Sequence, residues 1–233
     1  MATKKKLLQA AAGNAGGDAA LNVEDVFSTY LYDGNGSTQT ITNGIDLAGE
    51  GGLVWIKERD NAESHQLFDT ERGNTKVLST DSTSAEGTVT TRVTGFNSNG
   101  FSLGSNVSVN QSSTGYASWT FRKAPKFFDV VTFTLSNASK DVPHSLNGTV
   151  GSIFMKRTDS SQNWYVWHRG AASGNYLSLN NTNAQSSSDN MFGTHTDTTI
   201  NVGAGWMSGT FVAYIFAHND GDGEFGPDAD ADI

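Results

Sequence analysis

Cysteine is absent from this 233-residue chain, and proline occurs only three times. Without cysteine the chain can form neither a disulfide nor a thiolate metal site. Its stability therefore has to come from burial, hydrogen bonds and contacts between subunits. The chain also lacks a run of about 18 consecutive apolar residues, so we expect neither a transmembrane helix nor membrane insertion.

The chain also has few positively charged residues. The chain has 15 Lys and Arg residues against 24 Asp and Glu residues, which gives a formal net charge of −9. Nucleic-acid binding depends on cationic side chains that neutralise phosphates. We therefore expect no nucleic-acid partner.

What the chain does contain is glycine, with 26 residues, and many Ser, Thr and Asn residues between short apolar runs. Stretches that favour helices occur only near the N-terminus. This balance predicts an all-β fold made of many short strands joined by tight turns. The length suggests one or two domains.

One short segment of the sequence occurs twice in similar form. Residues 52–57 read Gly-Leu-Val-Trp-Ile-Lys, and residues 151–156 read Gly-Ser-Ile-Phe-Met-Lys. Each is followed by a polar turn and a second aromatic strand, and further matches follow in the same order at a nearly constant offset. Such ordered self-similarity indicates a duplicated unit.

We therefore predict two tandem antiparallel β-sandwich units of a jelly-roll or lectin-like kind, covering residues 25–124 and 125–218, with a hinge at Pro125. An alternative is a single larger sandwich to which both copies contribute sheets. The expected strands of the first unit cover residues 27–33, 38–42, 53–57, 65–68, 76–79, 88–93, 100–103 and 116–122. Those of the second cover residues 127–134, 153–156, 164–168, 176–178, 200–203 and 211–216.

Residues 1–24 form a separate segment. Residues 4–12 could make a short helix, which the following glycines would end. A helix of this length is not stable alone in water, so we expect it to be ordered by docking on a partner. A solvated tail is the alternative. The expected docking residues are Lys4, Lys5, Lys6, Leu7 and Leu8.

Residues 219–233 are acidic and rich in Gly and Asp, as in a linker or tail, which raises the hypothesis that the natural chain continues past Ile233. Asp220, Asp222 and Glu224 could hold calcium through their oxygens. However, Phe225 stands where an EF-hand needs its turn glycine. A solvated acidic run is the default interpretation, and we expect no cofactor.

No catalytic constellation emerges from the candidate motifs. Residues 100–104 fit the esterase pattern G-x-S-x-G, but no helix pattern follows to make the required elbow. Asp69 and Glu71 could serve as paired carboxylates in glycoside hydrolysis, but the second unit has no counterpart to them. Asp69 and Arg72 are better explained as a salt bridge in a turn.

Metal binding through histidine is not expected either, because the five histidines lack metal-ligand spacing. They are His65, His144, His168, His195 and His218. We therefore expect neither an enzyme nor a metal site.

The aromatic strand of the second unit offers one candidate contact site. Trp164 and Trp167 point to opposite faces of that strand. Trp167 aligns with Phe68, which predicts a core position, whereas Trp164 aligns with the polar His65, which predicts a surface position. For Trp164, with His65 as its counterpart, we weigh contact with another subunit, glycan binding and simple partial burial.

Six motifs stand out, at residues 5–13, 25–30, 52–57, 68–73, 96–101 and 116–121. They resemble motifs of tail-fibre-like structural proteins of marine tailed bacteriophages, and the resemblance covers nearly the whole chain. It implies a structural or adhesive virion protein with tandem units and no enzyme activity. The second half departs from the block at residues 69–72 of the first half, so no role of that block carries over to it.

We accordingly expect a tail fibre or fibre-like tail appendage, made in the host cytoplasm and bound to other virion proteins through its N-terminal segment. Self-association, as a trimer above all, follows from that class of protein. Binding of a host surface glycan is compatible with it. A capsid decoration protein or head fibre is the alternative, and a carbohydrate-active enzyme is a third hypothesis.

Overall fold

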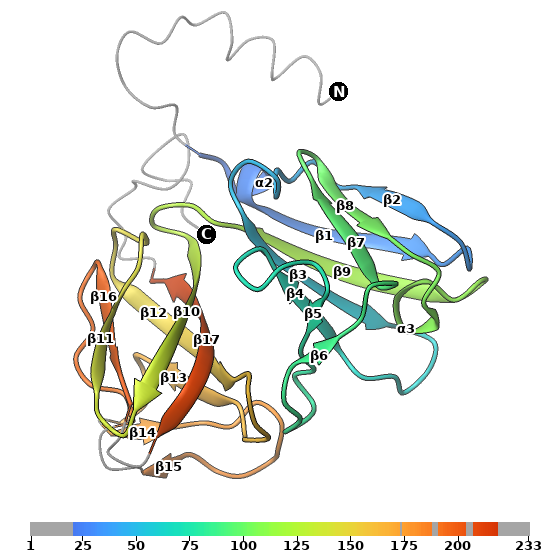
Figure 1. Cartoon of the computed structure of the whole chain (residues 1–233). Helices are drawn as coiled ribbons and strands as arrows, with labels where there is room; N and C mark the ends of the chain where they lie inside the picture. Colours follow the sequence, from blue (N-terminus) through green and yellow to red (C-terminus); the bar gives the residue numbers. More distant parts are fainter. Residues whose placement is uncertain (1–20, 173, 188–190, 204–206, 219–233) are drawn as a thin grey trace, which may run out of the picture.

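The computed structural model describes residues 21–172, 174–187, 191–203 and 207–218 of the chain. In these residues nearly all regular structure is antiparallel β-sheet, so the predicted all-β class is confirmed (Figure 1). The first half contains α2 (Val23–Val26), β1 (Phe27–Asp33), β2 (Gln39–Thr42), β3 (Gly52–Glu58), β4 (Gln66–Asp69), β5 (Lys76–Val77), β6 (Gly87–Thr88), β7 (Val93–Asn97), β8 (Gly100–Leu103), α3 (Val107–Asn110) and β9 (Gly115–Arg122). The second half contains β10 (Phe128–Ser136), β11 (Lys140–Pro143), β12 (Val150–Arg157), β13 (Tyr165–His168), β14 (Asn175–Tyr176), β15 (Ser186–Ser187), β16 (Thr199–Val202) and β17 (Ser208–Ala217).

The strands form one large sheet in each half. The order is β1-β9-β3-β4 in the first half and β10-β17-β12-β13 in the second. The first large sheet faces the small sheet β2-β8-β7, and the second faces the pair β11-β16. Each half is therefore a sandwich of a large and a small sheet.

Each sandwich encloses its own core. The core of the first half includes Val54, Ile56 and Phe68 from the large sheet and Phe101 from the small one. These side chains are fully buried. Because side chains alternate along a strand, Val54 and Ile56 point inward while Leu53 and Trp55 point to the other face of the sheet.

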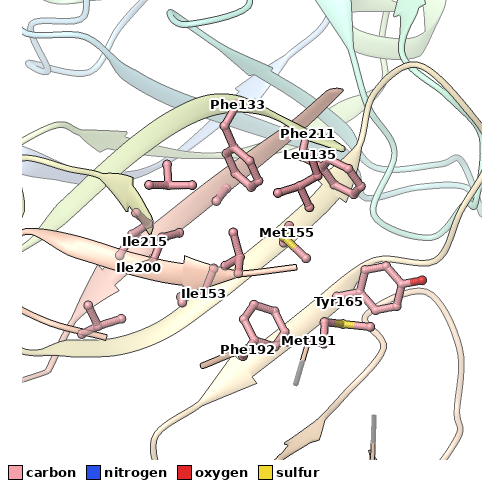
Figure 2. Packing of buried hydrophobic residues seen from close by; sticks show 14 of the residues in the cluster. Phe133, Leu135, Ile153, Met155, Tyr165, Met191, Phe192, Ile200, Phe211 and Ile215 are labelled. Atoms are coloured by element: carbon pink, nitrogen blue, oxygen red, sulfur yellow. The ribbon is translucent and has the colours of Figure 1, made fainter. Parts of the chain in front are cut away.

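The core of the second half has the same layout. Figure 2 shows Phe133, Ile153, Met155 and Phe211 from the large sheet gathered in one cluster with Ile200 of β16. Trp167 packs against this cluster, on the core side of its strand as predicted, but it is only half-buried.

A third cluster lies where the outer faces of the two large sheets meet, and we call it the seam. Leu53, Leu67 and Leu78 of the first half contact residues of the second half there. The contributions of the second half are Phe128, Val130, Trp164, Val212 and Tyr214. The large sheets are thus buried on both faces where they meet, and the halves share a continuous apolar contact.

The choice between the two predicted arrangements stays a prediction. Each half has its own sandwich, and the halves also pack sheet against sheet across the seam. The predicted boundary at residues 124 and 125 falls in the connection between β9 and β10. The duplication itself stays a prediction.

The glycines that open the repeated stretches have a steric role. Gly52 has φ of +155°, and a Cβ there would collide with the carbonyl oxygen of Phe121 on β9. A Cβ at Gly151 would lie 2.7 Å from the carbonyl oxygen of Ala217 on β17. Both strands approach their neighbours too closely for a side chain.

Several details differ from the expected strands, among them β7 and β15, which were not expected. The strand expected at residues 88–93 is wrong, because the chain turns there between β6 and β7. β11 was not expected, since Lys140–Pro143 has only one buried residue and shows little apolar signal. The single-turn helices α2 and α3 were also missed, because four residues are too few to show a helical period.

Candidate functional site

A network of buried polar groups crosses the seam and is the strongest candidate site in the described residues. Asp69 ends β4 and is fully buried. Its Oδ2 accepts hydrogen bonds from Arg72 Nε at 2.6 Å and from the Tyr214 hydroxyl at 2.7 Å. Its Oδ1 accepts from the Arg72 backbone N–H at 2.9 Å. Tyr214 lies on β17, so these bonds join the two halves.

The Arg72 guanidinium also contacts two other side chains of this network. Arg72 Nη2 lies 3.1 Å from the Tyr214 hydroxyl, and Arg72 Nη1 lies 3.0 Å from Glu86 Oε2. Glu86 also pairs with Lys76 at 3.2 Å. Burial raises the pKa of Tyr214 well above its usual value, so the phenol stays neutral and can donate to Asp69.

This geometry confirms the turn salt bridge predicted for Asp69 and Arg72. It gives no support to paired carboxylates, because Asp69 is sealed from solvent and Glu71 pairs with Lys123 at 2.8 Å. A general acid or base has to reach a substrate within hydrogen-bond distance. The network therefore holds the fold together rather than presenting a reactive group.

The G-x-S-x-G motif forms no nucleophile elbow. Ser102 lies within β8, and its hydroxyl accepts a hydrogen bond from Asn97 Nδ2 at 3.0 Å. A short helix, α3, does follow, contrary to expectation, but it begins five residues later at Val107. The motif matches an ordinary strand in this fold.

A cleft of about 510 Å³ lies beside β10 and β11, with Glu71 and Lys123 of the first half in its wall. Lys123 on one wall lies 2.8 Å from Glu71 and 3.2 Å from Asp129. Burial disfavours the charged ammonium, but the two carboxylates outweigh that effect and raise the pKa of Lys123. Asp129 Oδ2 also accepts the Ser145 backbone N–H at 2.7 Å. The main charges of this cleft are thus neutralised by each other.

Two histidines lie at the rim of the second core. His144 Nδ1 accepts the Leu146 N–H at 3.2 Å, and His195 Nδ1 accepts the Asn201 N–H at 3.2 Å. Burial lowers the pKa of both rings, to about 4 for His195, where proximity to His144 adds to the effect. Both rings are therefore neutral at pH 7. In the part of the chain that the structure describes, no group of three or more His, Asp or Glu side chains could hold a metal ion.

The surface position predicted for Trp164 is wrong. Its side chain is 0% exposed and belongs to the seam. Its indole Nε1 donates to the carbonyl oxygen of Ser79 at 2.9 Å. The alignment with His65 placed it on the surface, but a loop of the first half covers this position. Trp164 thus contacts the other half of its own chain and is not available to a glycan.

His65 remains accessible on the first half. It is half-buried, and its Nδ1 accepts a hydrogen bond from Trp55 Nε1 at 2.8 Å. The Trp55 ring in turn meets Trp119 edge-on at 6.0 Å. Glycan or subunit contact at His65 stays a prediction.

The remaining predicted residues lie outside the described part of the chain. These are the docking residues Lys4, Lys5, Lys6, Leu7 and Leu8, and the calcium candidates Asp220, Asp222 and Glu224. In the described ranges, no helix has both the length and the apolarity needed to cross a bilayer.

Sequence reasoning missed Tyr214, Glu86 and Lys156. Lys156 is fully buried, and its ammonium donates to the carbonyl oxygens of Thr83 at 3.2 Å and Arg157 at 2.9 Å. Burial and the neighbouring Arg157 lower the pKa of Lys156 to about 8. The only available signal was its place at the end of the repeated stretch.

The fold and the seam define an all-β sandwich protein whose buried polar groups hold two halves together. Residues 22–228 match the model of a family described as a domain of unknown function, DUF7483. The match covers most of the chain, so the protein belongs to this family. Neither a curated protein nor a solved structure matches the chain.

Proposed function

We propose that this protein is a structural component of a bacteriophage virion, a tail fibre or fibre-like tail appendage attached through its N-terminal segment. The resemblance of its motifs to tail-fibre-like virion proteins suggests the particle. The observation that carries the structural role is the seam, where both large sheets bury their outer faces against each other. Adhesion to a host surface follows from the proposed class.

A projecting appendage has to transmit force without its modules separating. In this chain an apolar cluster and a polar network both cross between the halves. Asp69, Arg72 and Tyr214 are fixed to one another within 3.1 Å or less. Buried, fully satisfied networks make a structure rigid. Because the chain has no cysteine, this packing takes the place of covalent cross-links.

The proposal is tested on particles. A variant lacking residues 1–24 is expected to fold normally but to be missing from purified virions, because the docking segment has been removed. Its β-sheet circular dichroism and melting temperature provide the control for folding. Incorporation at the level of the full chain would contradict attachment through this segment.

Copy number separates the tail from the capsid. A tail appendage is present in few copies per particle, whereas a capsid decoration protein or head fibre is present in hundreds. Quantitative mass spectrometry of purified virions, with the major capsid protein as the internal standard, gives this number. Absence of the chain from virions would overturn a virion role altogether.

A further inference from the structure

The two halves carry corresponding loops, which differ in what they contact. We call residues 79–86, between β5 and β6, the first arm, and residues 178–185, between β14 and β15, the second arm. We call the turn between β3 and β4, residues 57–65, the first socket. The turn between β12 and β13, residues 156–164, is the second socket.

The first arm fills the second socket within the chain. Gln162 N donates to the carbonyl oxygen of Thr83 at 2.8 Å, and Lys156 Nζ donates to the same oxygen at 3.2 Å. Glu86 N donates to the carbonyl oxygen of Thr158 at 2.9 Å. In Figure 1 the connection between β5 and β6 reaches from the first half to the loops of the second. These contacts are mostly between backbone groups.

The arms and sockets of the two halves correspond position by position. His65 N donates to Asp81 Oδ1 at 3.2 Å, and Trp164 N donates to Asn180 Oδ1 at 2.8 Å. Each bond fixes an arm to the residue just before the fourth strand of its own sheet. Leu67 bridges Leu78 in the first half, as Val166 bridges Leu177 in the second.

The sockets correspond equally well. Asp60 Oδ2 accepts from the Gly115 N–H, and Asp159 Oδ2 accepts from the Thr210 N–H at 3.1 Å. Lys57 Nζ donates to the Glu58 carbonyl oxygen at 2.6 Å, as Lys156 does to that of Arg157. The two sockets therefore share these two hydrogen bonds.

The first socket is open. Its residues 59–63 are all exposed, and no hydrogen bond within the described residues uses the Glu63 N–H or the Arg59 carbonyl oxygen. In the second socket the equivalent groups of Gln162 and Thr158 are the ones that bind the first arm. Leu31, on β1 of the same large sheet, is 58% exposed.

The second arm is also unused. Residues 182–185 are exposed. Leu177, before the arm, is 39% exposed, whereas its counterpart Leu78 is 2% exposed and lies in the seam. The protein thus presents one empty socket and one free arm of the kinds that bind each other inside the chain.

Charge favours this pairing. The first socket contains three acidic residues, Glu58, Asp60 and Glu63, and two basic ones, so it has a net negative charge. The second socket contains one acidic residue, Asp159, and two basic ones, so it has a net positive charge. The first arm carries two acidic residues, Asp81 and Glu86, and the second arm carries no charge. An uncharged arm avoids the like-charge repulsion that an acidic arm would meet in the first socket.

We infer that the second arm of one molecule docks in the first socket of another copy of this chain. By correspondence, the Thr182 carbonyl oxygen accepts from the Glu63 N–H, and the Gln185 N–H donates to the Arg59 carbonyl oxygen. The contact is head-to-tail, so it produces rings or filaments according to the rotation between copies. This inference is independent of any role in a virion.

Thiol cross-linking tests the contact, because the chain has no cysteine of its own. The variants Glu63→Cys and Thr182→Cys are mixed in equal amounts and treated with a short bifunctional thiol reagent. We expect severalfold more two-chain product in the mixture than with either variant alone. The double variant E63C/T182C is expected to give a ladder of larger products.

Two controls accompany this experiment. The variant Thr83→Cys with Gln162→Cys reproduces the contact inside one chain and should cross-link without a change in chain number. Thr134→Cys places a thiol on an exposed part of β10 and, mixed with Thr182→Cys, gives the background. Circular dichroism and thermal melting show that each variant is folded.

Three results would overturn the inference. The first is a mixture that cross-links no more than the Thr134 background. The second is Glu63→Cys alone giving as much product as the mixture, which indicates a two-fold contact instead. The third is sedimentation of the unmodified chain at the single-chain mass of 24.8 kDa at every concentration up to the millimolar range. Concentration-dependent growth in mass that Ala184→Arg abolishes would support it.

Discussion

Tyr214 joins the two halves of the protein through one hydroxyl group. This hydroxyl donates to Asp69 and lies 3.1 Å from Arg72, in surroundings from which water is excluded. Removing one partner of a buried, charged network leaves the others without full hydrogen bonding. Loss of this one hydroxyl group therefore weakens the seam without a change in its shape.

Tyr214→Phe is expected to lower the free energy of unfolding by about 1–3 kcal/mol, because Asp69 loses a hydrogen bond inside the seam. Urea unfolding followed by circular dichroism measures the change. Tyr30→Phe is the matched control, since Tyr30 is 37% exposed and should change stability by less than about 0.5 kcal/mol. Equal effects of the two variants would contradict the role given to the network.

His195 is expected to make the second half sensitive to acid. Its ordinary pKa is 6.5, and burial with the help of His144 lowers it to about 4 in the fold. Between these values the unfolded chain binds more protons, so stability is full above pH 6.5 and is lost as the pH falls through 4. The loss is at most about 3 kcal/mol.

Unfolding free energies measured between pH 4 and 7 test this expectation. His195→Phe keeps an aromatic ring against Trp167, which the imidazole meets edge-on at 4.4 Å, but cannot titrate. Its stability is expected to depend less on pH, with His144 supplying part of what remains. Titration of the His195 ring followed by NMR with a midpoint near 6.5 would contradict the expectation.

At the scale of elements, the connection between β5 and β6 does more than join two strands. It provides the Ser79 carbonyl oxygen to Trp164 and the Thr83 carbonyl oxygen to Gln162 and Lys156. Loops normally lie on the surface and are solvated. Here the loop replaces solvent over the large sheet of the second half, which is why Trp164 is fully buried.

Trp164→Phe is expected to cost about 2–4 kcal/mol, because it leaves a cavity and removes the bond to Ser79. Thermal and urea unfolding measure the loss. Trp119→Phe serves as the comparison: Trp119 is half-buried on the corresponding face of the first sheet, and its change should cost less than about 1 kcal/mol. A loss at Trp164 no larger than at Trp119 would argue against docking of the first arm as a stabilising contact.

At the scale of the whole molecule, the seam makes the halves dependent on each other. Separating them would expose Phe128, Val212 and Tyr214, which are at most 1% exposed in the whole chain. It would also leave Asp69 and Arg72 without their partner on the second half. Two domains joined only by a linker would incur neither cost.

The full chain is therefore expected to unfold in one cooperative transition. Differential scanning calorimetry should give a calorimetric enthalpy equal to the van't Hoff enthalpy, which is the signature of a two-state process. Residues 125–218 expressed alone should bind a dye for exposed apolar surface or aggregate. Two resolved transitions in the full chain would show that the halves fold independently.

Much of this organisation can be predicted from the sequence because a strand shows a local pattern of residue types. The alternation along residues 53–56 sends Val54 and Ile56 to one face and Leu53 and Trp55 to the other. Asp69 and Arg72 are three residues apart, so their salt bridge in a turn was also predictable. Such features depend on neighbours within a few positions, which the sequence specifies directly.

The sequence by itself determined the all-β class and the apolar faces of the strands. Only the tertiary structure decided that Trp164 is buried while its counterpart His65 is not, and that Tyr214 completes the site of Asp69 and Arg72. The physical reason is that these outcomes depend on contacts between residues up to 145 positions apart. Local patterns specify which face of a strand is apolar, but only the packing of the two sheets determines what covers that face.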